Sequence, residues 1–342
     1  MNAPASSSSV SSCTPKPPGR ILTFYSYKGG TGRSMALANV AWILAQAGHR
    51  VLAIDWDLEA PGLHRYFGPF LDDPELTETI GLVDFLDQFQ DGARRENLRV
   101  TNAKEGPAWF EEYASLLHVT VPVKHTFPTA ATGMAAEASQ VAGGNAGDRV
   151  NSNANSKARV GCLHLVPAGR QGSTYGQRVA AIRWDDFYEK FGGGIFLEVV
   201  KARLRETYDF ILIDSRTGLS DTSGICTVQM PDDLVVCYTL NRQSILGAAA
   251  IAESASGMRR KPSGEYSLRV WPVAMRVELA EKDRLEAARA MARQRFGGVV
   301  RHLSRNVRRD YWGQSEVLYF PFYAYEEVLA PVADRPLTQA TL

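Results

Sequence analysis

A glycine-rich turn between an apolar strand and an apolar helix constrains this sequence more than any other feature. Residues Ile21 to Tyr25 predict a buried strand, and Ser34 opens a helix that extends to Gln46. Between them lies the segment Lys28-Gly29-Gly30-Thr31-Gly32-Arg33. Its glycines let backbone N–H groups approach an anion closely, and the helix dipole favours negative charge at the same place. The segment therefore predicts a phosphate-binding site for a nucleotide.

This turn departs at two positions from the common phosphate-binding pattern G-x-x-x-x-G-K-[ST]. Tyr27 stands at the first glycine position and Arg33 at the lysine position. Ser34 keeps the hydroxyl that ligates Mg²⁺ in such loops. A dinucleotide-binding fingerprint is excluded because Met35 occupies the place of its third glycine. A glycine turn without any ligand is the remaining alternative.

The loop Lys28-Gly29-Gly30-x-Gly32-Arg33-Ser34 resembles the deviant Walker A loop of the ParA/MinD class of P-loop ATPases. More narrowly, it is similar to bacterial ParA-like proteins whose loop ends in Gly-Arg. The resemblance implies a three-layer α/β/α P-loop NTPase fold with a mostly parallel sheet, and ATP and Mg²⁺ as cofactors. It also implies an ATP-dependent homodimer in which Lys28 reaches the phosphates of the partner. The loop from Gly29 to Gly32, together with Arg33, would hold the phosphates of the chain's own nucleotide.

Two buried strands end in acidic residues that fit this resemblance. Asp214 ends the apolar run that begins at Phe210, which is typical of the Walker B acid that holds Mg²⁺, usually through water. Asp57 follows the strand Val51 to Asp55 and matches the second acid of the family's D-x-D segment, which orients the hydrolytic water. A helix cap or a loop salt bridge is the alternative role for Asp57. Asn241 follows a later strand and is predicted to contact the base or ribose.

The rest of the chain indicates an alternating α/β layout in one domain, residues 20–342. Further strands are predicted at 163–166, 234–238, 268–273 and 317–320, with a short one at 116–121, and further helices at 195–206 and 284–294. Residues 1–19 are rich in serine and proline and predict a disordered tail. A low-complexity stretch at about 122–159 predicts a mobile insertion. No topology is predicted for residues 68–120, although Leu82, Leu86 and Phe89 suggest a helix there.

Composition excludes several other classes of protein. The 38 basic and 37 acidic residues leave a net charge of +1, which points to no partner. No apolar stretch approaches the ~20 residues that span a bilayer, and no secretory signal is evident, so we expect a cytoplasmic protein without membrane contact. The four cysteines lack metal-site spacing.

One segment in the last fifth of the chain is rich in arginine. Residues 284–309 contain eight arginines and one acid, and four of the arginines are predicted to share one helical face: Arg301, Arg305, Arg308 and Arg309. Such a face could contact DNA phosphates without sequence preference, although a solvated helix face is the simpler interpretation.

We therefore expect an ATP- and Mg²⁺-dependent molecular switch that hydrolyses ATP slowly and regulates an unidentified effector protein. Lys28 and Asp57 are its candidate catalytic residues. Arginine at position 33 is planar and bidentate, unlike the compact ammonium that it replaces, so binding without hydrolysis remains open. The alternatives are a non-hydrolysing nucleotide-gated adaptor and a DNA-associated positioning ATPase.

Overall fold

A computed structural model describes residues 17–98, 107–127, 160–218, 224–263 and 267–333. The expected tail falls outside these residues up to position 16, and the expected insertion falls outside them over 128–159. The strands are β1 (Arg20–Ser26), β2 (Arg50–Asp55), β3 (Val121–Pro122), β4 (Cys162–Val166), β5 (Phe210–Asp214), β6 (Asp233–Thr239), β7 (Arg269–Val277) and β8 (Glu316–Leu318). The α-helices are α1 (Arg33–Gln46), α2 (Leu63–Phe67), α3 (Leu82–Arg95), α4 (Pro107–Tyr113), α6 (Tyr175–Ala181), α7 (Gly193–Thr207), α9 (Arg242–Met258), α10 (Lys282–Phe296), α11 (Arg305–Gln314), α12 (Phe322–Tyr325) and α13 (Ala330–Ala333). Short 3₁₀ and π turns are η1 (Gly68–Phe70), η2 (Leu117–Val119), η3 (Asp186–Lys190) and η4 (Ile225–Gln229).

The described strands form an eight-stranded sheet in the order β3-β4-β2-β5-β1-β6-β7-β8. Only β3 runs antiparallel to its neighbour among these strands, and the other pairs are parallel. Helices cover both faces, so the central strands are buried on both sides and have continuous apolar sequences. The predicted three-layer α/β/α architecture with a mostly parallel sheet is confirmed.

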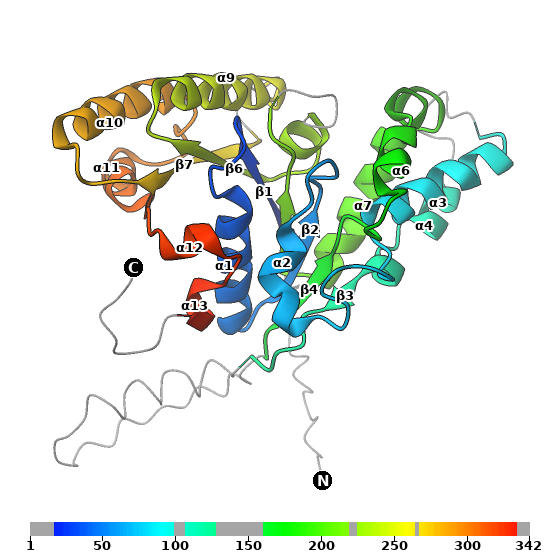
Figure 1. Cartoon of the computed structure of the whole chain (residues 1–342). Helices are drawn as coiled ribbons and strands as arrows, with labels where there is room; N and C mark the ends of the chain where they lie inside the picture. Colours follow the sequence, from blue (N-terminus) through cyan, green and yellow to red (C-terminus); the bar gives the residue numbers. More distant parts are fainter. Residues whose placement is uncertain (1–16, 99–106, 128–159, 219–223, 264–266, 334–342) are drawn as a thin grey trace, which may run out of the picture.

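The two faces of the sheet have separate apolar cores because side chains alternate along each strand. Helix α1 packs Leu37, Ala41 and Trp42 against one face, where Phe24 and Leu212 point. The opposite face is covered by α3 and α7 at one end and by α9 and α10 at the other. Figure 1 shows these two helix groups apart, with α9 and α10 along the top of the view and α3, α4, α6 and α7 together at the right.

Parallel pairing brings the carboxyl ends of β1, β2 and β5 to one edge of the sheet. Asp55 lies opposite Asp214 in the β2–β5 pair, and Phe24 lies opposite Asp214 in the β1–β5 pair. At this edge the glycine-rich turn follows β1, Asp57 follows β2, and Asp214 is the last residue of β5. This edge is where ligands bind in open parallel sheets.

The structure corrects the predictions between residues 68 and 127. The short strand expected at 116–121 is wrong: the chain forms the 3₁₀ turn η2 first, and only Val121 and Pro122 pair with β4. The predicted helix around Leu82 is confirmed as α3, which buries its apolar face. The expected insertion does not begin at 122, because Val123 and Phe127 are buried against the core around α1.

The predicted arginine face is wrong for Arg301, whereas Arg305, Arg308 and Arg309 lie together in α11. Helix α10 ends at Phe296, the buried Val300 follows, and α11 begins only at Arg305. Arg301 therefore lies in the turn before α11 and does not share a helical face with the later arginines. Arg308 donates a hydrogen bond to the backbone oxygen of Leu303 at 3.0 Å, which turns it toward its own chain.

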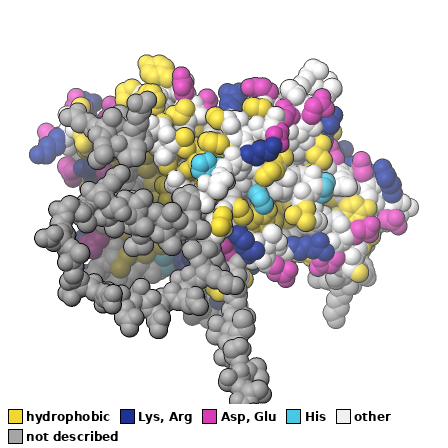
Figure 2. All heavy atoms as spheres, turned by 90° about the horizontal axis from the view of Figure 1, so that it is seen from below, with side chains coloured by type: hydrophobic (Ala, Val, Ile, Leu, Met, Phe, Trp, Pro, Cys, Tyr) yellow, Lys and Arg dark blue, Asp and Glu magenta, His cyan; other side chains and the backbone are white. Residues whose placement is uncertain are grey.

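The visible surface mixes both signs of charge. Figure 2 shows lysine and arginine side chains interspersed with aspartate and glutamate on the face seen from below. No helix in the described part of the chain is long and apolar enough to cross a membrane. Cys162, Cys226 and Cys237 are free thiols.

Candidate functional site

The glycine-rich turn after β1 has the backbone geometry of an anion-binding loop. Gly30 (φ +70°) and Gly32 (φ +90°) adopt the left-handed conformation that favours glycine. Gly32 caps α1 without any side-chain acceptor in the described chain, so the first backbone N–H groups of the helix remain available to a ligand. A Cβ atom at Gly29 or Gly30 would meet no described atom within 4 Å, which shows that the loop is open on its outer side. The loop can therefore receive a phosphate at the positive end of α1.

Arg33 does not extend toward the open loop but lies between two carboxylates. Its Nε atom donates to Asp214, and its Nη2 atom donates to Asp57 at 2.8 Å. The Arg33 side chain is only 6% exposed, and those of Asp57 and Asp214 are 9% and 1% exposed. The third nitrogen, Nη1, is buried and has no hydrogen-bond partner among the described residues. One guanidinium thus bridges Asp57, which was predicted to orient the hydrolytic water, and Asp214, which was predicted to hold Mg²⁺.

The electrostatics of this cluster follow from burial and from close like charges. Burial raises the pKa of Asp214, while Arg33 and the Ser34 hydroxyl oppose that shift. Burial and the neighbouring Asp214 raise the pKa of Asp55 well above its usual value, against the backbone N–H of Leu63 that donates to Asp55. Burial alone would lower the pKa of Arg33, but the two carboxylates outweigh it and raise that pKa. The cluster therefore contains one permanent positive charge, on Arg33, among several buried carboxylates. A second positive charge nearby would stabilise the ionised form of these carboxylates.

The residues present fit a nucleotide with Mg²⁺. Ser34 lies close enough to Asp214 for its hydroxyl to oppose the rise in the pKa of that carboxyl, and hydroxyl and carboxylate oxygens are ligand types that Mg²⁺ prefers. The hydroxyl of Thr31 is buried in the loop and has no partner among the described residues. Together with Nη1 of Arg33, it is an unused polar group beside the loop, as expected of a site that receives phosphate oxygens.

Lys28 and Asn241 each have a partner near the start of α9. The Lys28 ammonium donates to the side chain of Gln243. Asn241 caps α9, accepting from the backbone N–H of Ser244 at 2.9 Å and donating to the hydroxyl of Thr239. Both side chains thus have a structural partner here, and the predicted roles toward nucleotide stay predictions.

Arg276, near the end of β7, is a candidate site residue that sequence reasoning missed. Its guanidinium donates to the backbone oxygen of Gly30 at 2.9 Å and lies over the ring of Tyr319 at 4.7 Å from the ring centre. Its φ of +54° is left-handed, which costs energy for a residue with a side chain, and the β7–β8 pairing is irregular between Ala274 and Val277. No sequence motif identifies this position, because the contact depends on the tertiary arrangement of β7 and the loop.

Comparison with known proteins gives one family and a set of similar structures. The family model of the CobQ/CobB/MinD/ParA nucleotide binding domain matches residues 22–311. No curated protein matches the sequence.

Three solved structures illustrate the similarity. The pNOB8 ParA bound to nonspecific DNA is 15% identical over 91% of this chain and 84% of that one, with a TM-score of 0.48. The Cyanothece McdA(D38A)–ATP complex is 15% identical over 91% and 92%, with a TM-score of 0.47. The septum site-determining protein MinD of Pyrococcus horikoshii OT3, complexed with Mg-ADP, is 18% identical over 80% and 77%, with a TM-score of 0.45.

Proposed function

Because the chain belongs to the family of CobQ/CobB/MinD/ParA nucleotide-binding domains, we propose that it is an ATP- and Mg²⁺-dependent molecular switch. In this proposal ATP binds at the loop after β1, closes a homodimer and is hydrolysed slowly, and the two nucleotide states are read by an effector protein. The observation that supports the proposal most is the position of Arg33. Arg33, which stands at the position of the usual phosphate-binding lysine, is held by the two acids of the site, Asp57 and Asp214.

This arrangement makes Arg33 the moving part of the switch. Without nucleotide, Asp57 and Asp214 share the single positive charge of Arg33. A triphosphate at the loop competes for the same guanidinium, because phosphate oxygens accept its fork of N–H groups as well as a carboxylate does. When Arg33 turns to the phosphates, both carboxylates lose their cation and Asp57 becomes free to orient a water molecule.

Ser34 and Asp214 are the residues that would hold Mg²⁺, which supplies positive charge toward the phosphates and toward Asp214. The chain's own contribution is to place a hydroxyl and a carboxylate together at the first turn of α1. Lys28 would exchange its bond to Gln243 for phosphates of the second subunit in the closed dimer.

The test measures binding and hydrolysis separately. Calorimetry should show ATP binding that requires Mg²⁺ in the parent, and Asp214→Asn should lose most of the Mg²⁺ dependence. Asp57→Ala should keep binding but lower hydrolysis about a hundredfold, the usual effect of losing one group that acts on the transition state. Asp72→Asn changes an exposed acid and serves as the matched control. Absence of any binding heat at millimolar ATP in folded protein would refute the proposal.

A second candidate is a nucleotide-gated adaptor that binds ATP without turnover. The bond from Arg33 to Asp57 favours it, because the guanidinium occupies one oxygen of Asp57 at 2.8 Å and competes there with a water molecule. In that case the parent should bind ATP and show no multiple turnover, and Arg33→Lys should start hydrolysis. Sustained turnover by the parent would eliminate this candidate.

A further inference from the structure

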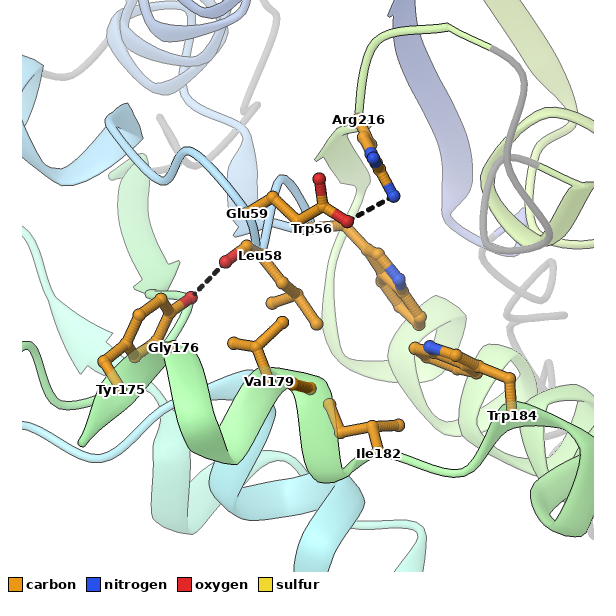
Figure 3. A pocket seen from close by; sticks show the side chains of 10 residues that line it. Trp56, Leu58, Glu59, Tyr175, Gly176, Val179, Ile182, Trp184 and Arg216 are labelled. Carbon is orange, nitrogen blue, oxygen red and sulfur yellow. Dashed lines mark hydrogen bonds and ion pairs between the residues drawn. The ribbon is translucent and has the colours of Figure 1, made fainter.

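A pocket of about 510 Å³ lies near the edge of the sheet where β2 and β5 end, and its lining residues do not include the glycine-rich loop. Three segments enclose it: the loop after β2, helix α6 with the residues that follow it, and the loop after β5. Figure 3 shows the indoles of Trp56 and Trp184 pointing toward one another, with Leu58, Val179 and Ile182 forming the apolar side of the pocket. A concave apolar space of this size, with aromatic walls, is typical of a site for a small ligand.

One charged group gives the pocket a chemical preference. Trp56 is 4% exposed, and its Nε1 atom is buried without a hydrogen-bond partner among the described residues, so Trp56 contributes apolar ring surface to the pocket wall. Arg216 lines the pocket from the loop after β5 and forms an ion pair with Glu59 through Nη1.

The Arg216–Glu59 pair can be opened by a ligand. Glu59 is 52% exposed and Arg216 is 34% exposed, so the pair is partly solvated and contributes little to stability. A guanidinium has five N–H donors, and a carboxylate of a ligand could take the place of Glu59 in a bidentate geometry. Together, the guanidinium and the aromatic and apolar walls favour a flat apolar molecule that carries one negative charge.

The pocket shares its walls with the phosphate site. The backbone N–H of Trp56 donates to the backbone oxygen of Asp214 at 2.9 Å, and Arg216 follows Asp214 by two residues. On the other side, the Tyr175 hydroxyl donates to the backbone oxygen of Leu58 at 2.7 Å, which joins α6 to the loop after β2. A ligand in the pocket therefore touches the same two loops that carry Asp57 and Asp214.

We propose that this pocket is a binding site for a small aromatic carboxylate, held by Arg216 and the Trp56 indole between Trp184 and the apolar side of α6. The inference needs no nucleotide, so it stands or falls separately from the proposed ATP binding.

The test is a calorimetric titration of 2-naphthoate into the nucleotide-free full chain, in the presence of EDTA. We expect a dissociation constant of about 1 mM or tighter, which is the range for a ligand of this size. Arg216→Met should weaken binding about tenfold, because a charged hydrogen bond is lost. Glu59→Gln should strengthen it about threefold, because the competing carboxylate of an exposed pair is removed.

Two controls separate the pocket from adventitious binding. Val179→Trp fills the pocket and should abolish binding, while Val307→Trp adds the same side chain at an exposed position of α11 and should not. The uncharged 2-naphthalenemethanol should bind more weakly and should not respond to Arg216→Met. The proposal is overturned if 2-naphthoate does not bind at 5 mM (about five times the expected limit), or if Arg216→Met leaves its affinity unchanged. It is equally overturned if a folded Val179→Trp variant binds as well as the parent.

Discussion

Replacing Arg33 with methionine removes one charge from the most buried ionic cluster of the site and keeps the length of the side chain. The guanidinium is 6% exposed and bonds to Asp57 and Asp214, which are nearly as buried. Breaking a buried ion pair by removing one partner costs about 3–5 kcal/mol, because the remaining charge is left without compensation. Here two carboxylates are left. Protonation of Asp214, whose pKa burial already raises, limits the loss, so we expect about 3–5 kcal/mol rather than twice that.

The assay is urea unfolding of nucleotide-free protein at pH 7.5, with Arg309→Met as the matched control. Arg309 is 81% exposed and lies 3.4 Å from Asp310, so its removal should change the free energy of unfolding by less than about 0.5 kcal/mol. The double variant Arg33→Met/Asp214→Asn should be more stable than Arg33→Met alone, with a coupling energy of about 1–3 kcal/mol. If Arg33→Met unfolds within about 1 kcal/mol of the parent, the cluster does not depend on Arg33 and the reasoning is refuted.

Three further predictions concern single residues. Lys28→Ala should abolish dimer formation with a non-hydrolysable ATP analogue, measured by light scattering, while a dimer of unchanged affinity would exclude the role of Lys28 across the interface. Arg276→Gly should be about 1 kcal/mol more stable than Arg276→Ala in urea unfolding, because glycine accepts the φ of +54° without strain; equal stabilities would contradict this. Slight desolvation would raise the pKa of Asp73, but hydrogen bonds from residues 77–79 outweigh it and lower that pKa. The ionised Asp73 therefore stabilises the folded protein fully above about pH 4, and this contribution is lost as the pH falls further. Asp73→Ala should therefore destabilise by about 1 kcal/mol at pH 7 and by less at pH 2.5, where the loss of this stabilisation has begun, and a pH-independent loss would show that another interaction matters.

The central part of the fold was predictable because its strands are buried on both faces. Such strands have continuous apolar sequences, and β5 shows the pattern from Phe210 to Ile213, before Asp214 ends the strand. The strand at 116–121 was not predictable in the same way. Leu116 and Val119 are both buried, but the chain reaches that burial through a 3₁₀ turn, in which residues three apart share a face. A short apolar run does not distinguish the two conformations.

The candidate site was predictable as a set of residues and not as a set of contacts. The glycine spacing and the acids at strand ends identify Arg33, Asp57 and Asp214 separately. Their ion pairs depend on the β2–β5 register and on the direction in which α1 leaves the loop, and these are tertiary properties. Arg276 carried no sequence signal at all, since its contact with Gly30 arises from an irregular strand pairing.

The short strands at the two rims of the sheet restrict how a second copy can associate. In the described part of the chain, β3 pairs through two residues, one of which is Pro122, and β8 is three residues long. Proline lacks the N–H needed to extend a ladder, and a rim this short offers little template for an added strand. Edge-to-edge growth, the common route to continuous intermolecular sheets and aggregates, is thus disfavoured at both ends, so self-association is left to loop and helix surfaces.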